Sequence, residues 1–366
     1  MDSWLLEFQM NMSKVHGKVD EFLSQIGKLM KHLDIGCILV YSNTEKHISA
    51  LFSNNKGLNV FLQSAKNGLL TLDIHTTSVE NAYFKNLVNE LDEKVRKLEF
   101  AEIPKTPPYD SLPAMKRGRE FSHYDIVHGI RLVERDFDKL VFDEVTSRQH
   151  LRVLHSIEFG NCLYCDNDIT IGEYDYESYS HALSGFGHVD YNGKRVLILG
   201  GGDACIVRRI KDMGSTMITA VEYDQRVVDV TKLYFREICG NLLDSMTGPN
   251  YEIVIEDAAE YLEKAVKTGL EFDVVINDIA TIPLSLEPVG ERWEFNLKLL
   301  ANSMKVLKHD GVFVSHGTSA SRLQGQKVYE AQLEKLEYPI RFTKEIGYIP
   351  TYQENWVVYI VWKKSS

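Results

Sequence analysis

Hydrophobic residues recur every three or four positions at two places in the first third of the chain, the spacing of one face of an α-helix. This spacing predicts helices over residues 12–33 and 81–100. Between them, β-favouring runs alternate with Asn, Gly and Lys turns. These runs are residues 37–41, 47–53, 58–62 and 69–74. The order predicts an αββββα module of about one hundred residues, in which no catalytic constellation is visible.

The pattern changes in the middle of the chain. Residues 102–115 contain four prolines and are typical of a linker. From there to residue 172, β-rich runs alternate with turn clusters, which predicts a small antiparallel sheet. We therefore expect an N-terminal α+β domain at 1–103, a proline-rich linker at 104–116 and a small β-domain at 117–172.

From residue 173 to 366, strands alternate with helices, and this predicts βαβ units in a parallel, doubly wound, Rossmann-like α/β sheet. The predicted strands are residues 195–200, 217–222, 251–257, 273–278 and 311–316. The clearest helix is residues 292–308. Two late β runs, 340–349 and 356–364, are expected to close the sheet as a hairpin-like edge.

The length of 366 residues, with 44% hydrophobic and 25% charged content, indicates an ordinary soluble protein of two or three domains. No secretory signal is evident, and the late apolar run 356–362 is too short to span a bilayer, so we expect a cytoplasmic protein without a membrane segment. Five cysteines form no disulfide framework. Cys162 and Cys165 form a CxxC, but on a strand and turn they point to opposite faces and are typical of packing cysteines.

The net charge of −11 disfavours a nucleic-acid partner, because phosphates need a surface rich in Lys and Arg. It is compatible with a cationic substrate drawn into a negative cleft. Most acidic proteins are acidic only for solubility, so the net charge decides nothing by itself.

Four consecutive predicted strands each deliver a carboxylate to the same edge of the sheet. They are Asp203 after the first glycine turn, Glu222, Asp257 and Asp278. One such residue is usually a helix cap, but ligands of doubly wound sheets bind at this edge. Like charges so placed repel one another unless cations occupy the cleft.

The loop after the first strand contains Gly200, Gly201 and Gly202, and glycines let the backbone approach a ligand closely. The G-x-G-x-x-G pattern is incomplete, because Cys205 takes its last position. Glu222 follows Gly200 by 22 positions (222 − 200), a usual place for a carboxylate that binds a ribose hydroxyl. A pyrophosphate beside Asp203 is unfavourable, which disfavours NAD. The loop favours a nucleoside with a cationic tail, such as a decarboxylated adenosyl sulfonium.

The motifs "LILGGGD", "VEYD", "IED" and "VVINDI" resemble the successive strand ends of the polyamine aminopropyltransferases. The loop "NDIATIP", the C-terminal stretch "IPTYQENWVVYIVWKK" and the N-terminal module resemble more narrowly the spermine synthases of that family. The resemblance covers nearly the whole chain and is strongest from Lys139 onward.

This resemblance implies a methyltransferase-like fold, with an N-terminal domain that resembles S-adenosylmethionine decarboxylase and forms a homodimer. It implies decarboxylated S-adenosylmethionine and spermidine as substrates, with spermine and 5'-methylthioadenosine as products. Neither a metal nor a bound cofactor is implied, and no His or Cys spacing typical of a metal site is visible.

The same resemblance implies the role of each matching residue. Asp278 takes the position of the general base. The amine-binding positions are Asp203, Tyr179, Tyr352 and Glu354, with Tyr176 competing for the place of Tyr179. The nucleoside-binding positions are Gln149, Glu222, Asp257 and Ala258.

Two motifs depart from the family pattern. Ala204 and Cys205 replace the last two glycines of G-G-G-D-G-G, and "SHGTSAS" differs from the usual strand end "QGN". Spermidine or thermospermine synthesis, methyl transfer on the same fold and polyamine binding without catalysis therefore stay open as alternatives.

Overall fold

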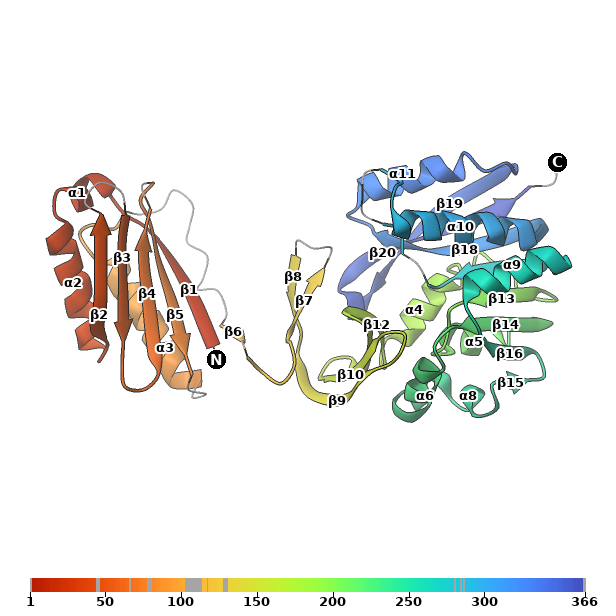
Figure 1. Ribbon diagram of the computed structural model, residues 1–366, viewed down its shortest axis with the longest axis horizontal. Coiled ribbons are helices and arrows are strands. Elements are labelled where there is room, and N and C mark those ends of the chain that lie inside the picture. Colours follow the sequence, from red (N-terminus) through yellow and green to blue (C-terminus); the bar gives the residue numbers. More distant parts are fainter. Residues whose placement is uncertain are drawn as a thin grey trace. The chain divides into compact units, whose positions relative to one another are not determined.

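The structure is a computed structural model (Figure 1). It describes residues 2–43, 47–65, 67–77, 81–102, 114–116, 118–127, 131–279, 281–283, 285 and 287–364. The chain divides into two compact units, residues 1–123 and 124–366. The prolines of the expected linker lie outside the described residues.

The first unit is an antiparallel sheet with helices on one face. Its strand order is β2-β3-β4-β5-β1-β6. The strands are β1 (Asp2–Gln9), β2 (Gly36–Asn43), β3 (His47–Ser53), β4 (Leu58–Ser64), β5 (Leu69–Thr76) and β6 (Met115–Lys116). The helices are α1 (Met12–His16), α2 (Val19–His32) and α3 (Asn81–Arg96). Alternate strand residues such as Val60 and Leu72 pack with Ile26 and Leu91 of the helices in one core.

The predicted αββββα order differs from the structure in two ways. It lacks the first strand, β1, and it joins α1 and α2 into one helix. β1 precedes the helices and pairs with both β5 and β6, so it lies inside the sheet. Its buried Trp4, Leu6 and Phe8 alternate with exposed Leu5 and Glu7, the same period of two that predicted the other strands. The first expected helix is two helices, because the chain turns between α1 and α2.

The second unit begins with antiparallel β structure, as the sequence predicts for this segment. The strands are β7 (Tyr124–Val127), β8 (Arg131–Glu134), β9 (Phe137–Val145), β10 (His150–Ser156), β11 (Gly160–Cys165) and β12 (Asp168–Gly172). β7 and β8 form a two-stranded ribbon, and the other four form a sheet of order β12-β11-β10-β9. This sheet belongs to the second unit, and the separate domain boundaries stay a prediction.

The rest of the second unit is a doubly wound sheet of order β15-β16-β14-β13-β17-β18-β20-β19. Its strands are β13 (Arg195–Leu199), β14 (Met217–Glu222), β15 (Thr247–Gly248), β16 (Tyr251–Ile255), β17 (Phe272–Asn277), β18 (Leu307–Ser319), β19 (Ile340–Ile349) and β20 (Glu354–Lys363). The five strands predicted from the βαβ pattern are all present and pair in parallel. The late β runs form the predicted hairpin, and β20 pairs antiparallel with β18.

Helices cover both faces of this sheet (Figure 1). They are α4 (Tyr176–Leu183), α5 (Cys205–Ile210), α6 (Gln225–Tyr234), α7 (Arg236–Cys239), α8 (Leu242–Ser245), α9 (Ala258–Thr268), α10 (Glu291–Val306) and α11 (Leu323–Leu333), with a 3-10 turn η1 (Pro350–Tyr352). Successive residues of β13 therefore pack into different cores. Val196 and Ile198 pack into the core on one face of the sheet, and Leu197 and Leu199 pack into the core on the other. The sequence of a strand that is buried on both faces is a continuous run of apolar residues.

The strand order reverses between β13 and β17, since β14 lies on one side of β13 and β17 on the other. Such a reversal leaves a crevice at the carboxyl ends of the strands, where ligands of doubly wound sheets bind. None of the helices in the described ranges combines the length and the apolar character needed to cross a membrane.

Candidate active site

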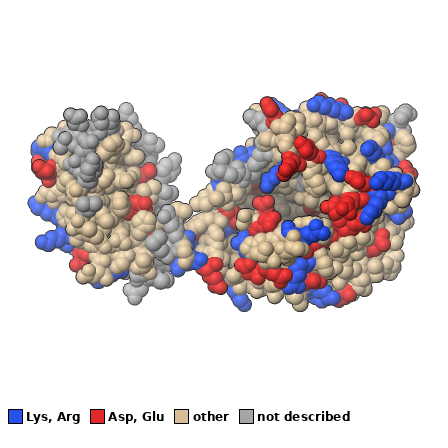
Figure 2. Space-filling model, viewed as in Figure 1, with Lys and Arg blue, Asp and Glu red and all other residues tan. Residues whose placement is uncertain are grey.

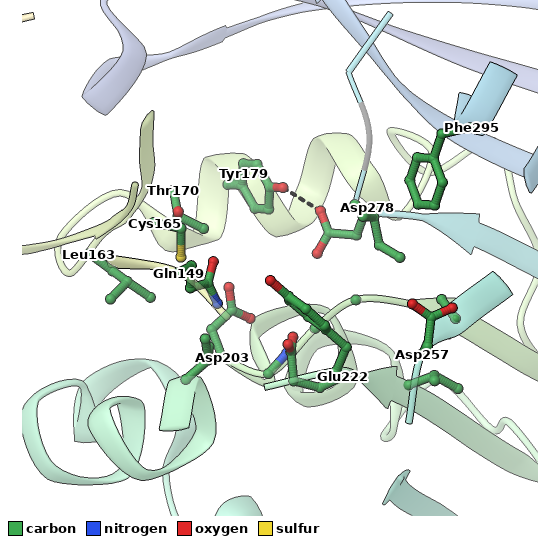
Figure 3. A pocket seen from close by; sticks show the side chains of 18 residues that line it. Gln149, Leu163, Cys165, Thr170, Tyr179, Asp203, Glu222, Asp257, Asp278 and Phe295 are labelled. Carbon is green, nitrogen blue, oxygen red and sulfur yellow. Dashed lines mark hydrogen bonds between the residues drawn. The ribbon is translucent and has the colours of Figure 1, made fainter. Parts of the chain in front are cut away.

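A cavity of about 420 Å³ opens at the carboxyl ends of β13, β14 and β17 (Figure 3). Its wall contains all the predicted nucleoside-binding residues, the three glycines, Asp203, Asp278 and Tyr179. The complete lining is Gln149, Leu163, Cys165, Thr170, Tyr179, Gly200, Gly201, Gly202, Asp203, Val221, Glu222, Tyr223, Val227, Asp257, Ala258, Asp278, Ile279 and Phe295. The structure thus brings together residues spread over the second unit.

The glycine turn after β13 forms the floor of the cavity. Gly200 has a φ of +93°, and its N–H donates to the carbonyl of Val221 at 2.8 Å, which ties β13 to β14. Asp278 N–H donates to the carbonyl of Leu199 at 2.9 Å, which ties the turn to the end of β17. A Cβ at Gly202 would lie 2.7 Å from Cγ and Oε2 of Glu222. Position 202 therefore needs glycine because the Glu222 side chain takes the space.

Ala204 adopts the conformation that glycine favours. Its φ of 60° and ψ of 12° lie in the left-handed region, and the residue is fully buried. A non-glycine residue there is uncommon and costs about 1–2 kcal/mol. Cys205 keeps an ordinary role at the start of α5, since its N–H donates to Oδ1 of Asp203 at 2.8 Å. The turn therefore holds both residues, Ala204 in a glycine-like conformation and Cys205 at the start of α5.

Glu222, at the end of β14, is held by backbone groups. Its Oε2 accepts from Gly202 N–H at 3.1 Å and its Oε1 from Asp224 N–H at 3.0 Å. Burial raises the pKa of Glu222, and the charge of Asp203 adds to this, whereas the backbone hydrogen bonds lower it. The carboxylate is therefore positioned before any ligand arrives.

Asp278 follows β17 and accepts a hydrogen bond from the hydroxyl of Tyr179 on α4 (Figure 3). Burial raises the pKa of Asp278 well above its usual value, and the neighbouring charge of Asp203 raises it further. The Tyr179 hydrogen bond opposes this, because it stabilises the ionised form. Burial likewise raises the pKa of Asp203.

The negative charge of the cavity has no counterpart in its wall. The described lining contains four carboxylates, Asp203, Glu222, Asp257 and Asp278, and neither lysine nor arginine. Figure 3 shows the carboxyl groups of Asp203, Glu222 and Asp278 turned towards the same space. Figure 2 shows the second unit hollowed on this face, with Asp and Glu as well as Lys and Arg side chains around the hollow. Such an arrangement favours a ligand with positive charge.

Asp257 and Gln149 also line the cavity. Asp257 caps α9, with Oδ1 accepting from Ala259 N–H at 2.8 Å and Glu260 N–H at 3.1 Å. Gln149 donates from Nε2 to Oδ2 of Asp224 at 3.1 Å. Asp257 is therefore both a helix cap and a lining residue.

An aromatic cluster, defined as Tyr179, His316, Tyr352 and Trp356, adjoins Asp278. Ring centroids are 5.9 Å apart for Tyr179 and His316, 6.1 Å for Tyr179 and Tyr352, and 5.1 Å for Trp356 with each of His316 and Tyr352. Burial lowers the pKa of His316 to about 4, so its imidazole is neutral at pH 7. Tyr352 donates its hydroxyl to the carbonyl of Thr170 at 2.9 Å.

Glu354, predicted as an amine-binding residue, lies outside the lining of the cavity. Its carboxylate is 2.5 Å from Nη2 of Arg131 on β8. The Glu354 side chain is 4% exposed and that of Arg131 46% exposed. Tyr352 also lies outside the lining, but its ring packs against Tyr179. Tyr176 is stacked with Arg208 and does not line the cavity.

The sequence did not indicate several residues of the wall. Cys165 ends β11 and was interpreted from its CxxC motif as a packing cysteine, Thr170 comes from β12, which carries no motif, and Phe295 comes from the middle of α10. Tyr223 and Ile279 each directly follow a predicted carboxylate, so their positions in the sequence could have indicated that they line the cavity. His316 belongs to the motif "SHGTSAS", and the sequence indicated it only because this motif differs from the usual strand end "QGN".

Comparison with known proteins points to one family. A family profile described as "Spermine/spermidine synthase domain" matches residues 176–366. The polyamine aminopropyltransferase of Bacillus subtilis (strain 168) is 31% identical over 184 residues, 49% of this chain and 61% of that protein. That of Desulforudis audaxviator (strain MP104C) is 34% identical over 183 residues, 48% of this chain and 60% of that protein. The chain spans about 60% of the length of these relatives.

The solved structure of spermidine synthase from Thermotoga maritima is similar in fold. It has a TM-score of 0.53 and 22% sequence identity, and the match covers 69% of this chain and 81% of that one. The predicted methyltransferase-like α/β fold is consistent with this similarity. The relation of the first unit to S-adenosylmethionine decarboxylase stays a prediction.

We expect Gly202→Ala to lower the free energy of unfolding of the second unit by about 1–3 kcal/mol, because the added Cβ displaces the Glu222 carboxylate. Gly325→Ala is the matched control in the same unit: its Cβ would lie 3.4 Å from the carbonyl oxygen of Pro283, an ordinary contact. Urea unfolding of both variants measures the difference. Equal stability of the two would show that Glu222 adapts freely.

Proposed function

Because the chain belongs to the spermine/spermidine synthase family, whose profile matches residues 176–366, we propose that it transfers an aminopropyl group from decarboxylated S-adenosylmethionine to a polyamine. The acceptor we propose is spermidine, with spermine and 5'-methylthioadenosine as products. The observation that carries the proposal is the set of four carboxylates with no lysine or arginine in the described lining of the cavity. Both proposed substrates bring positive charge and no negative charge to it.

The donor binds with its nucleoside at Glu222, Asp257, Ala258 and Gln149. Glu222 is preorganised by two backbone N–H groups, which supports a role as acceptor for ribose hydroxyls. The cationic tail then lies beside Asp203. Intact S-adenosylmethionine carries a carboxylate that Asp203 would repel, so charge favours the decarboxylated donor.

The acceptor amine binds between Asp278 and the aromatic cluster. Tyr352 and Trp356 offer apolar faces to the methylenes between nitrogens, and aromatic faces also attract ammonium groups. The narrower assignment to spermidine is supported by the loop "NDIATIP" and by the N-terminal module, both of which resemble spermine synthases.

The reaction begins with the loss of a proton, because an ammonium group has no lone pair. Asp278 takes this proton, and the freed lone pair forms a bond to the aminopropyl carbon next to sulfur. The carbon–sulfur bond breaks with its electron pair staying on sulfur, which becomes a neutral thioether. The new secondary amine keeps one positive charge. A general base so placed contributes about 10²–10⁴-fold.

Positioning supplies a larger share of the rate. Holding donor and acceptor in line can lower the barrier by about 7–11 kcal/mol. The sulfonium is already a good leaving group, so the proposed transfer requires neither a metal nor a bound cofactor.

We also propose that the chain forms a homodimer through its first unit. Leu5, Phe61 and Leu51 lie in one row across β1, β4 and β3, with Asp73 of β5 between Leu5 and Phe61. They alternate with core residues and so face away from the helices. Leu5 is 38% and Phe61 44% exposed, which supports an apolar contact on this face.

The transfer is tested by incubating the protein with decarboxylated S-adenosylmethionine and putrescine or spermidine, with products identified by mass. We expect spermine from spermidine, and a loss of at least about 100-fold in Asp278→Asn with donor binding retained, because only the base is removed. Product from putrescine alone would identify a spermidine synthase. Binding without any product would identify a polyamine-binding protein, and normal turnover in Asp278→Asn would exclude Asp278 as the base.

The pH dependence of kcat/KM provides a second test of the base. The base must be ionised, so activity rises with pH through the raised pKa of Asp278. Tyr179→Phe removes a hydrogen bond that lowers this pKa and should move the acid limb to higher pH. Asp203→Asn removes a charge that raises it and should move the limb down. Shifts in the same direction would contradict the assignment.

For the homodimer, we expect light scattering of the full chain to give twice its mass of 41.9 kDa. Phe61→Glu places a charge beside Asp73 and should yield the single chain. Ile157→Glu, at a position 70% exposed in the second unit, is the control and should leave the mass unchanged. A dimer that persists in Phe61→Glu would place the contact elsewhere.

A further inference from the structure

The carboxylate of Glu354 is buried and forms an ion pair with the cationic side chain of Arg131. Glu354 lies at the start of β20, its side chain is 4% exposed, and it pairs with Arg131 of β8 at 2.5 Å. This contrasts with Asp203 and Asp278, for which the described lining of the cavity provides no lysine or arginine.

A chain of contacts connects Asp278 with the neighbourhood of Glu354. Tyr179 donates to Asp278 and packs against Tyr352, whose ring centroid is 5.1 Å from that of Trp356. Glu354 and Trp356 are alternate residues of β20 and face the same side of the sheet. An extended acceptor that starts at Asp278 and follows the aromatic cluster therefore points towards Glu354.

We infer that Arg131 determines which length of acceptor the site prefers, by holding the place on Glu354 that the distal ammonium of a triamine would take. This inference rests on the proposed function and narrows it. A diamine bound at Asp278 leaves the Arg131–Glu354 pair intact. A triamine reaches the pair, and its third positive nitrogen must displace the guanidinium.

The surroundings of Arg131 allow this displacement. Arg131 belongs to a two-stranded ribbon, and nearly half of its side chain is in water, so its guanidinium stays hydrated when it leaves Glu354. Arg135, just after the same strand, is 3% exposed and donates to Asp125 at 2.7 Å and to the carbonyl of Thr351 at 2.6 Å. Arg135 anchors the ribbon to η1 while Arg131 is replaceable.

The test is Arg131→Gln, which leaves Glu354 without this cation. The variant should lose thermal stability, since a buried carboxylate without its partner is costly. Spermidine should restore that stability and putrescine should not, because only the longer amine carries a cation to Glu354. The ratio of KM for spermidine to KM for putrescine should fall about tenfold relative to the wild type.

Arg119→Gln is the matched control. Arg119 pairs at 2.7 Å with Asp2, and the side chains are 31% and 6% exposed, so a similar pair is broken in the first unit. Its loss of stability should not be restored by either amine. If Arg131→Gln does not fold, the double variant Arg131→Gln with Glu354→Gln removes both charges, and spermidine should then stabilise it no more than putrescine does.

A thermal response to spermidine that is the same in Arg131→Gln and the wild type would overturn the inference, and so would recovery of Arg119→Gln by spermidine. In the double variant, a stabilisation specific to spermidine would overturn it as well. These readouts need no turnover. Failure of every acceptor to react with the donor would count against the proposed transfer alone.

Discussion

The central constraint on this protein is the repulsion among carboxylates at one edge of a parallel sheet. Asp203, Glu222 and Asp278 each end or follow a neighbouring strand, and burial raises the pKa of all three. A fold tolerates this only where the cost is offset, and in the described lining neither lysine nor arginine offsets it. The raised pKa of Asp278 relieves part of this cost in the empty site, because it favours the neutral form. In the proposed function, a cationic ligand relieves the rest when it binds. In the proposed function, the same charges that make the empty site unfavourable select its ligands.

The glycine turn makes this concentration of charge possible. The N–H of Gly202 and of Asp224 each bind an oxygen of Glu222, and the missing side chain at Gly202 gives that carboxylate its space. Ala204 takes a glycine-like backbone conformation at some cost, which keeps Asp203 at the entrance of α5. Backbone geometry and charge placement thus depend on each other at this turn.

Most of the sheet and the carboxylates around the cavity could be predicted from the sequence, because apolar runs ending in an acidic residue mark buried parallel strands and their rim. β1 has an equally clear alternation at Trp4, Leu6 and Phe8, so this strand was also predictable from the sequence. Cys165, Thr170 and Phe295 could not be predicted, since their approach to the cavity depends on how β11, β12 and α10 pack. The Arg131–Glu354 pair joins residues far apart in the chain through an exposed ribbon, and no local pattern indicates it.

The hydrogen bond from Tyr179 to Asp278 shows how such a site can serve a proton transfer. In the empty cavity, burial and Asp203 favour the protonated form of Asp278, and Tyr179 favours the ionised form. In the proposed reaction, the bound ammonium and sulfonium add positive charge and shift the balance towards the ionised form. Under this proposal, Asp278 becomes ionised when the substrates that need a base are present. Because a carboxylate with a raised pKa is also a stronger base, the burial that destabilises the empty site strengthens the acceptor of the proton.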